Sequence, residues 1–569
     1  MSGSGSGYGD PGLLGPEELN AVVEEVLARL GTGASGAGAA GSLPTRGNRT
    51  RSASVATASA ASGPAAGVSA ASTSRDSEGA SAAPRPSHID AAAFGPGLVK
   101  DLDDAMTMAQ RSFDALQQQS LEARAAMIEA IRACVRREAP LVAEMAVQET
   151  ALGRAEDKIQ KNLLVGEKTP GIEVLEPWVR TGDRGLTLQE LAPWGVIAAI
   201  TPSTNPTETI ICNGIGMLAA GNTVVFCPHP LAQRTSAYMI ASLNRAIAEV
   251  GGPEAVFVGL LDPTIEKAQA LMTHSGSRML VVTGGPGVVK EAMRSGKRVV
   301  GAGPGNPPAV VDETADIEKA GKDLVRGASL DNNIICTDEK EVFVVSKVAD
   351  RLKEAMRGAG AYEVHGPQID RLADLVLQGG VRSDPRAAHV KKEWVGKDAG
   401  KILEAIGISA GGSGGPARGS AGVSGSGASG SSGSSAAGGG ARSDSGPRLI
   451  IAEVGPDHPF VWTELLMPIL PIVRMRNAEE AMDLAILAEK GNRHTASMHS
   501  HDVDRLSRMA RRVDCSIFIK NGPNFSGLGM GGEGYTSFTI AGPTGDGMTN
   551  ARTFARLRRC TLVDAFRIV

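Results

Sequence analysis

Between residues 196 and 295, short apolar runs alternate with helical segments, and this alternation constrains the fold more than any other feature of the chain. The apolar runs are typical of buried strands, and the amphipathic segments between them are typical of helices. Repeated β-loop-α units predict a parallel, doubly wound α/β sheet that binds ligands at the carboxyl ends of its strands. The predicted strands are Val196–Ile200, Thr223–Phe226, Val256–Val258 and Met279–Val282, and the predicted helices are Glu208–Ala220, one ending near Val250, Ile265–His274 and Val288–Ser295.

The loops after these strands are therefore the candidate ligand site. Thr201–Thr207 follows the first strand, and Cys227–Pro230 follows the second. Thr283–Gly287 follows the fourth, and its glycines let backbone amides at a helix N-terminus approach a phosphate. This turn does not match GxGxxG, so by itself it is weak evidence for a nucleotide. Ahead of this region, Leu98–Gln160 has helical spacing of its apolar residues.

A polar, turn-prone run, Ser329–Thr337, places Cys336 just before the β-branched segment Glu341–Val345. This arrangement suits a nucleophile on a loop that a rigid sheet holds in place. The alternative is that Cys336 is simply a small buried apolar residue, which is the commoner role for a lone cysteine.

Composition excludes several classes of function. The net charge is −4 with interspersed signs, so the chain has no basic field of the kind that nucleic-acid binding needs. The six cysteines show no CxxC spacing and do not cluster with histidines, which argues against disulfides or a metal site and favours a reducing compartment. No apolar run is long enough to span a membrane and no signal peptide is evident, so we expect a cytoplasmic protein without membrane contact.

Two segments, 31–87 and 409–446, consist almost entirely of Gly, Ala, Ser, Pro and Thr. They cannot bury enough apolar surface to offset the entropy of ordering, so we predict disorder in both. A body of roughly 440 residues remains, which is enough for two or three domains.

Pro16–Leu30 precedes the first of these segments and has the pattern of an amphipathic helix, with Pro16 in the first turn and Gly31 as the stop. Its apolar stripe is too short to order the helix without a partner. Because the predicted linker is long, we expect the helix to bind another protein's groove. The alternatives are packing on its own body or binding a membrane surface, and its acidic polar face disfavours the second.

Several motifs, taken in order, resemble the aldehyde dehydrogenase superfamily. Within it, the chain looks like the CoA-acylating propionaldehyde and acetaldehyde dehydrogenases of bacterial microcompartments. No single motif is decisive, but their order and spacing together are specific. The motifs are Ala192–Ile197, Pro202–Thr207, Gly221–Phe226, Thr283–Gly285, Gly305–Pro308 and Cys336.

The resemblance implies the domain organisation. It predicts a Rossmann-like NAD domain over 88–302, a catalytic α/β domain over 303–530, and a β-hairpin for oligomerisation near 181–191 that the C-terminal tail, 531–569, joins. It further implies that residues 1–31 form an encapsulation peptide followed by a linker over 32–87. The expected partners are shell or cargo proteins bound through residues 16–30, and a second copy of the chain in a dimer or tetramer inside the microcompartment lumen.

The resemblance also implies the chemistry. Cys336 attacks an aldehyde, and the Cys336 amide together with Asn205 stabilises the oxyanion. Hydride passes to NAD, and CoA then accepts the acyl group with His494 as a base of near-neutral pKa. NADP is not excluded, because Cys227–Pro230 replaces the Lys-Pro-x-Glu of many relatives. The residues implied in cofactor binding are Thr201, Pro202, Ser203, Thr204, Pro228, His229, Pro230, Thr283, Gly284, Gly285, Val288, Ala302, Glu464 and Leu466.

One departure from the wider family predicts the product. Hydrolytic members carry a glutamate base where this chain has Gly301. A thioester intended for CoA should not face a carboxylate that activates water. We therefore expect acyl-CoA as the product. The competing hypotheses are a hydrolytic dehydrogenase that releases free acid, a nicotinamide-independent cysteine acyltransferase or hydrolase built on Cys336 and His494, and a non-catalytic shell-associated protein.

Overall fold

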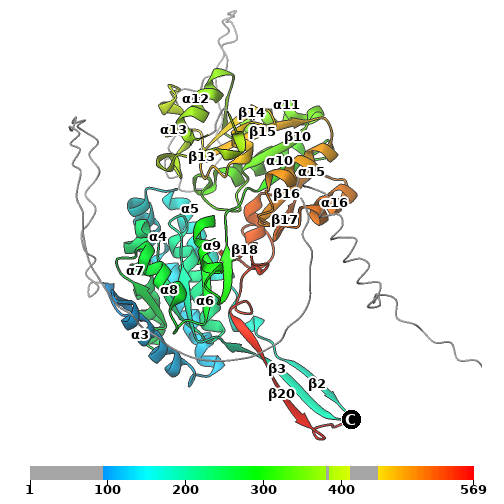
Figure 1. The fold of residues 1–569 in the computed structure, drawn as a ribbon. Helices are drawn as coiled ribbons and strands as arrows, with labels where there is room; N and C mark the ends of the chain where they lie inside the picture. The colour runs from blue at the N-terminus through cyan, green and yellow to red at the C-terminus, as the bar shows by residue number, and fades with distance from the viewer. Residues whose placement is uncertain (1–93, 380–382, 410–445) are drawn as a thin grey trace, which may run out of the picture. The chain divides into compact units, whose positions relative to one another are not determined.

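A computed structural model describes residues 94–379, 383–409 and 446–569 (Figure 1). The predicted helix Pro16–Leu30, the predicted linker and nearly all of the predicted insert, 409–446, lie outside the described residues.

Six parallel strands form the first sheet, in the order β1-β6-β5-β4-β7-β8. The central strand β4 is buried on both faces, as its uninterrupted apolar sequence predicts. The strands are β1 (Leu98–Val99), β4 (Val196–Ile200), β5 (Thr223–Cys227), β6 (Phe257–Leu260), β7 (Met279–Thr283) and β8 (Arg298–Ala302).

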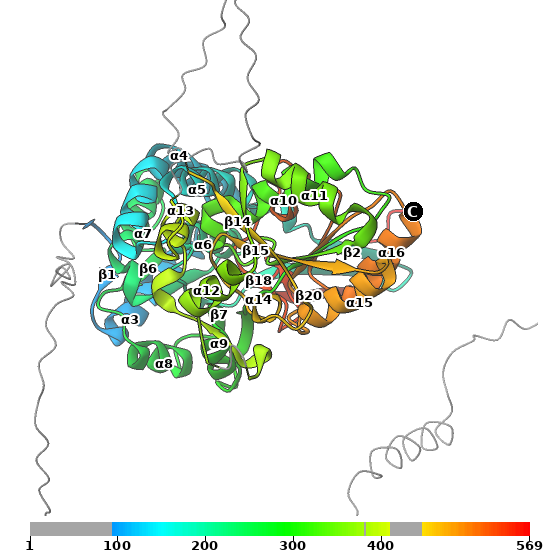
Figure 2. The same cartoon turned by 90° about the horizontal axis from the view of Figure 1, so that it is seen from above.

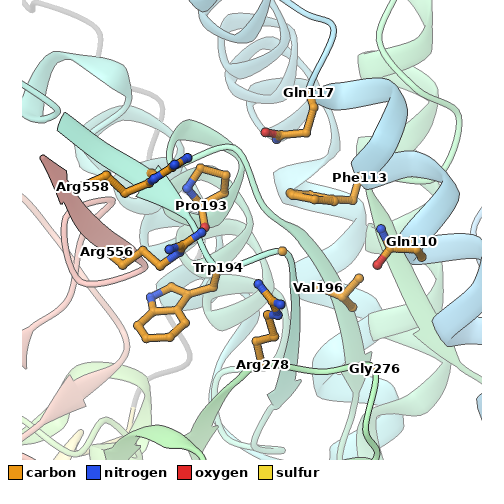
Figure 3. A pocket seen from close by; sticks show the side chains of 12 residues that line it. Gln110, Phe113, Gln117, Pro193, Trp194, Val196, Gly276, Arg278, Arg556 and Arg558 are labelled. Atoms are coloured by element: carbon orange, nitrogen blue, oxygen red, sulfur yellow. The ribbon is translucent and has the colours of Figure 1, made fainter. Parts of the chain in front are cut away.

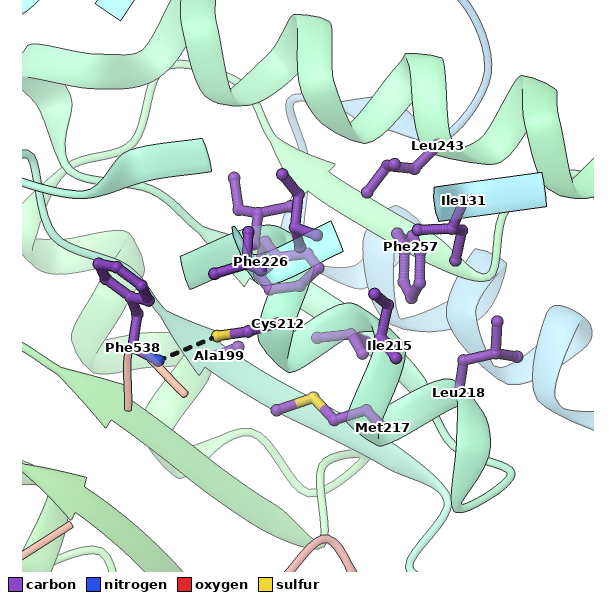
Figure 4. Packing of buried hydrophobic residues seen from close by; sticks show 14 of the residues in the cluster. Ile131, Ala199, Cys212, Ile215, Met217, Leu218, Phe226, Leu243, Phe257 and Phe538 are labelled. Carbon is purple, nitrogen blue, oxygen red and sulfur yellow. Dashed lines mark hydrogen bonds between the residues drawn. The ribbon is translucent and has the colours of Figure 1, made fainter. Parts of the chain in front are cut away.

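Helices cover both faces of this sheet. Successive side chains of a strand point to opposite faces, and alternate residues of each strand accordingly belong to different core clusters. Ile197 and Ala199 pack with α4, α6 and α7, whereas Val196 and Ala198 pack with α3, α8 and α9. Figure 4 shows the first of these cores, in which the Cys212 sulfur accepts a hydrogen bond from the Phe538 amide at 3.4 Å. The helices are α3 (Leu102–Leu116), α4 (Leu121–Thr150), α5 (Ala155–Lys168), α6 (Pro206–Ala219), α7 (Gln233–Glu249), α8 (Ile265–Thr273) and α9 (Pro286–Met293).

The order of strands in the first sheet reverses at β4. The chain winds outward from β4 through β5 to β6, and then returns to place β7 on the other side of β4. A reversal of this kind opens a crevice beyond the carboxyl ends of the two strands. The loops after Ile200 and Thr283 border it.

Seven parallel strands form the second sheet, in the order β11-β14-β15-β10-β9-β16-β17. Val342 and Val344 pack with α10 and α11 on one face, and Phe343 packs with α15 and α16 on the other. Figure 2 shows these two pairs of helices on opposite sides of the strands. The strands are β9 (Pro308–Val311), β10 (Glu341–Val345), β11 (Ala361–Val364), β14 (Leu449–Val454), β15 (Ile469–Met475), β16 (Thr495–His499) and β17 (Ile517–Lys520), and the helices are α10 (Ile317–Ser329), α11 (Ser346–Gly358), α12 (Pro367–Val376), α13 (Ala399–Ala405), α14 (Pro459–Trp462), α15 (Ala478–Ala488) and α16 (Val503–Val513).

A short connection brings the two parallel sheets together. β8 ends at Ala302 and β9 begins at Pro308, so only residues 303–307 separate them. A connection of this length spans at most about 20 Å. The carboxyl edge of the six-stranded sheet therefore lies beside the amino edge of the seven-stranded sheet.

A third, antiparallel sheet consists of β2 (Trp178–Gly182), β3 (Gly185–Pro193) and β20 (Ala555–Val563). It extends away from both parallel sheets, and the C-terminus lies at its tip (Figure 1). The C-terminal strand pairs with β3 along its whole length, from Ala555↔Pro193 to Val563↔Gly185.

The predicted α/β fold with parallel sheets is confirmed, whereas the domain boundaries stay predictions. Two local expectations need correction. Leu98–Val99, expected as the start of a helix, forms a strand that pairs with β6. The hairpin, expected near 181–191, runs from Trp178 to Pro193. No helix in the described part of the chain is long and apolar enough to cross a membrane.

Candidate active site

The loop that carries Cys336 has an unusual backbone. Asp331, Asn332 and Asn333 have φ angles of 47°, 55° and 63°, so three successive residues lie in the left-handed region. Asp and Asn are the non-glycine residues that adopt this region most readily. The sequence Asp-Asn-Asn therefore permits the tight turn between α10 and Cys336.

Lys340 holds this turn from inside. Its ammonium group donates hydrogen bonds to the Asn333 carbonyl at 2.9 Å, the Asn333 side-chain oxygen at 2.6 Å and the Ile335 carbonyl at 3.0 Å. Lys340 is 1% exposed, so these three bonds replace its hydration. The backbone immediately before Cys336 is consequently fixed by a buried cation.

Lys340 belongs to a run of four ionisable residues, Asp338–Glu341, of which each is at most 1% exposed. Burial raises the pKa of Asp338 and of Glu341 well above the ordinary range, and that of Glu339 to about 8. Burial thus favours the neutral form of each of these three carboxyl groups. The ammonium of Lys340 remains as the charge of this run beside the nucleophile.

Three groups meet around Gly305 next to Cys336. A Cβ built on Gly305 would lie 2.6 Å from the Cys336 carbonyl oxygen and 3.1 Å from Cγ of His494, so only glycine fits. The Gly305 amide donates a hydrogen bond to Oε1 of Glu464 at 3.2 Å. Cys336, His494 and Glu464, which precede β10, β16 and β15, therefore gather at the amino edge of the seven-stranded sheet.

The local electrostatics keep the Cys336 thiol protonated. Burial, and then the Glu464 carboxylate, raise the pKa of this thiol to about 12, although Lys340 acts in the opposite direction. Burial also raises the pKa of Glu464 to about 7, against the opposing effects of Lys340 and the Gly305 amide. Attack by Cys336 therefore requires a group that removes the thiol proton.

His494 is neutral in this site. Burial, and then Lys340, lower its pKa to about 3. Its Nδ1 bonds to Thr495 Oγ1 at 2.9 Å, whereas its Nε2 has no hydrogen-bond partner among the described residues. The expectation of a near-neutral pKa is thus wrong for the structure as it stands, because the imidazolium would be buried beside a cation. Glu464 is the neighbouring group whose pKa is near 7.

The residues predicted to bind the cofactor on the first sheet lie along one edge of it. Thr201–Thr204 follows β4, Pro228–Pro230 follows β5, and Ala302 ends β8. The Gly284 amide, just after β7, donates a hydrogen bond to the Ala302 carbonyl at 3.1 Å. A Cβ on Gly284 would lie 2.9 Å from Cγ1 of Val288, so the turn packs directly on α9.

This edge fits a nicotinamide nucleotide. Oγ1 of Thr201 is buried and has no hydrogen-bond partner within the described residues, so it is available to a ligand. Gly285 caps the N-terminus of α9, and a Cβ there would meet nothing within 4 Å, which leaves room for a phosphate. His229 has a local role as well, since its Nδ1 accepts a hydrogen bond from the Leu231 amide at 3.1 Å.

Leu466 is the remaining residue predicted to bind the cofactor. It lies two residues after Glu464 and has a φ angle of 52°, unusual for a branched side chain. Its carbonyl accepts a hydrogen bond from the Gly396 amide at 2.9 Å. This contact holds the segment that carries Glu464.

Asn205 directly precedes α6, in the loop after β4, and is 5% exposed. Its Oδ1 accepts a hydrogen bond from Nζ of Lys161 at 2.5 Å, and its Nδ2 donates to Oγ1 of Thr204 at 3.3 Å. Lys161 also pairs with Asp331, at 2.6 Å, on the turn that precedes Cys336. The predicted oxyanion residue is thereby tied to the nucleophile loop.

Gly301 lies within β8, and its amide donates a hydrogen bond to Thr544 Oγ1 at 3.2 Å. A Cβ at this position would lie 3.0 Å from Cγ1 of Val289. The position at which hydrolytic relatives carry a glutamate base therefore has no carboxylate in this chain. A larger side chain there would displace Val289.

A cavity of about 350 Å³ lies elsewhere, at the amino end of β4 (Figure 3). It is lined by residues of α3, of the junction of β3 and β4, and of β20, including Phe113, Trp194 and Arg556. Cys336 is not among its lining residues, and β4 separates it from the loop that begins at Thr201. We therefore do not assign the reaction to this cavity.

Comparison with known proteins decides the family. A sequence model of the aldehyde dehydrogenase family matches residues 87–391. The acetylating acetaldehyde dehydrogenase EutE of Salmonella typhimurium is 46% identical over 475 residues, which cover 83% of this chain and 94% of that protein. The chain belongs to the aldehyde dehydrogenase family.

Other members of the aldehyde dehydrogenase family are similar over the same length. The CoA-propanoylating propanal dehydrogenase of Citrobacter freundii is 42% identical, over 83% of this chain and 94% of that protein. The propionaldehyde dehydrogenase of Rhodopseudomonas palustris, solved with bound CoA and an acylated cysteine, is 44% identical with a TM-score of 0.75, over 83% of this chain and 99% of that one. A propionaldehyde dehydrogenase from the fucose-utilisation microcompartment of Clostridium phytofermentans is 40% identical with a TM-score of 0.75, over 83% and 100%. The resemblance inferred from the motifs is confirmed.

Sequence reasoning missed the buried cations of this site. Lys158 and Lys161 lie one turn apart on α5 and are 1% and 0% exposed, and Lys340 is buried behind Cys336. A lysine on a helix is usually solvent-exposed, so neither α5 position signals a role. The one available signal is the charged run Asp338–Glu341, whose last residue begins β10 and is followed by the apolar residues 342–345.

Proposed function

We propose that this chain oxidises a short-chain aldehyde, acetaldehyde or propionaldehyde, to its acyl-CoA, with NAD or NADP as hydride acceptor and CoA as acyl acceptor. The observation that carries the proposal is the position of Cys336. It lies on a clamped turn beside His494 and Glu464, where the amino edge of one sheet meets the nucleotide-type edge of the other. Acetylating and CoA-propanoylating dehydrogenases are similar to the chain over most of their length.

The first chemical step assigns a role to Cys336 and to two donors. The thiol loses its proton and the sulfur attacks the aldehyde carbon, which converts the carbonyl oxygen to an oxyanion. The Cys336 amide and Nδ2 of Asn205 are the donors we assign to that oxyanion. A bound nicotinamide would supply the hydride acceptor, and Thr201, Gly285 and Glu464 are the residues that would hold the dinucleotide.

The acyl group then stays on Cys336 as a thioester until the thiol of CoA takes it. A base must accept a proton both from Cys336 and from CoA. His494 offers a free Nε2, but its pKa of about 3 makes it a weak base, so Glu464, with a pKa of about 7, is the better proton acceptor. The thioester survives long enough for CoA because Gly301 provides no carboxylate to activate water.

A kinetic panel tests this function. Acetaldehyde, propionaldehyde and butyraldehyde are each offered with NAD or NADP, with and without CoA, while absorbance at 340 nm and the products are followed. We expect CoA-dependent reduction and acyl-CoA as the product. Free acid formed at the same rate without CoA would identify a hydrolytic enzyme, and thioester exchange without any nicotinamide would identify an acyltransferase.

We further propose that the antiparallel sheet mediates homo-oligomerisation. Apolar side chains are exposed on it, among them Trp178 at 48%, Leu557 at 66% and Val563 at 64%. Exposed apolar residues on an extended sheet are typical of a protein interface. Light scattering should give a dimer or tetramer for the wild type, and Leu557→Arg with Val563→Arg should shift it toward the monomer.

Residues 16–30 are proposed to attach the enzyme to shell or cargo proteins in a microcompartment lumen. The support is the amphipathic pattern of this segment and the similarity to an enzyme from a fucose-utilisation microcompartment. A fluorescent protein that carries residues 1–31 should be recruited to compartments. Diffuse fluorescence would contradict the assignment.

A further inference from the structure

We infer that Lys161 is a positioning residue for the reaction, which fixes the side-chain amide of Asn205 so that its NH₂ group faces the oxyanion. This inference rests on the proposed function, specifically on Asn205 as an oxyanion donor. The contact that supports it is the hydrogen bond of 2.5 Å from Nζ of Lys161 to Oδ1 of Asn205.

The chemistry of the lysine determines which way the amide points. An ammonium group can only donate hydrogen bonds, so the atom of Asn205 that faces it must be the carbonyl oxygen. The NH₂ group must then point the other way. One of its two protons has Thr204 Oγ1 as acceptor at 3.3 Å, and the structure gives the other no acceptor among the described residues. That proton is free for a substrate oxygen.

The bond also improves the donor itself. A cation on the carbonyl oxygen withdraws electron density from the amide, which makes its N–H groups more acidic and stronger donors. Lys161 keeps its charge, because the Asp331 and Glu208 carboxylates outweigh the effect of burial and raise its pKa. An amide that is already oriented costs nothing to reorganise when the oxyanion forms.

The burial of Lys161 is difficult to explain by stability alone. It is 0% exposed, and its counter-ions Asp331 and Glu208, at 2.6 Å and 3.0 Å, are equally buried. Buried ion pairs commonly contribute little net stability, because the desolvation cost cancels the attraction. A functional contact with Asn205 accounts for the retention of a cation at this point.

The neighbouring Lys158 provides a matched control. It lies on the same helix, is 1% exposed, and pairs with the same oxygen of Asp331 at 2.9 Å. Its second bond goes to the backbone carbonyl of Thr204 at 3.1 Å, and not to the side chain of Asn205. The two lysines therefore share burial and the ion pair with Asp331. They differ in that Lys161 also pairs with Glu208 and donates to the side chain of Asn205.

The test is a double-mutant cycle on the full-length enzyme. Lys161→Met and Lys158→Met are each made alone and together with Asn205→Ala, and kcat, KM for NAD and thermal midpoints are measured. Asn205→Ala should lower kcat roughly 10²–10³-fold. Lys161→Met should lower kcat about tenfold or more with KM for NAD unchanged. In the Asn205→Ala background Lys161→Met should lower kcat by less than about twofold, because the side-chain amide that Lys161 orients is absent.

The outcomes separate the inference from the function on which it rests. If Asn205→Ala retains kcat, the oxyanion role of Asn205 fails, and the inference with it. Two results would overturn the role of Lys161 alone when Asn205→Ala does lower kcat. One is that Lys161→Met lowers kcat by the same factor in the wild-type and Asn205→Ala backgrounds, and the other is that it lowers kcat no more than Lys158→Met does. If Lys161→Met does not fold, Lys161→Met with Glu208→Gln removes one charge of each sign, and the same coupling with Asn205→Ala decides.

Discussion

His494 should make the folded enzyme sensitive to acid, and the size of the effect follows from its environment. In the folded state burial, and then Lys340, lower the pKa of His494 from 6.5 to about 3. In the unfolded chain the imidazole takes up a proton below pH 6.5, whereas in the folded protein it cannot until about pH 3. The contribution of neutral His494 to the free energy of unfolding is therefore complete above pH 6.5 and is lost as the pH falls from 6.5 toward 3.

The expected magnitude can be compared with the stability of a typical domain. The free energy of unfolding should fall by about 1 kcal/mol at pH 5.5 and by about 3 kcal/mol at pH 4.5 through His494 alone. These are large fractions of the roughly 5–15 kcal/mol that stabilises a typical protein. Asn in place of His494 removes the titration and retains a polar group near the position of Nδ1, which bonds to Thr495.

Urea unfolding at pH 7.5, 5.5 and 4.5 measures the effect as the difference between the wild type and His494→Asn. The variant should be less stable than the wild type at pH 7.5, and this difference in the free energy of unfolding should narrow by about 3 kcal/mol at pH 4.5. His389→Asn, at an exposed position, is the matched control. A difference between the wild type and His494→Asn that stays constant with pH would refute the reasoning, because it would mean that the buried imidazole is already protonated or is hydrated in the folded state.

Three further predictions concern catalysis and targeting. Cys336→Ser should abolish CoA-dependent aldehyde oxidation. Cys560→Ser, at an exposed position of β20, is the control and should retain the activity. A Cys336→Ser rate above about one per cent of wild type would contradict the assignment of Cys336 as the nucleophile. Gly301→Glu should raise the release of free acid in the absence of CoA, with Gly301→Ala as the control for crowding, and an unchanged product ratio in a folded variant would show that water does not reach the thioester from this side. Deletion of residues 1–31 should leave kcat and KM near wild type and abolish recruitment to compartments, whereas a fall of several degrees in the thermal midpoint would place the segment in the folded body.

The features that depend on near neighbours could be predicted from the sequence. The alternation between residues 196 and 295 predicts four of the six strands of the first sheet, β4 to β7, since a strand and a helix each show their own apolar period. The Asp-Asn-Asn run marks the turn before Cys336, because those residue types tolerate a left-handed backbone. The ordered motifs then indicate the family, and with it Asn205 and Glu464.

What only the tertiary structure decided is the environment of those residues. The run Asp338–Glu341 would be assigned to the surface by composition, yet it is buried, and Lys158 and Lys161 meet Asp331 from more than 150 positions away in the sequence. The pairing of β20 with β3 is equally remote. The physical reason is that a charge can be buried only where its counter-ions and hydrogen-bond partners converge, and convergence of distant segments leaves no local pattern in the sequence. The low pKa of His494 and the orientation of Asn205 follow from that convergence.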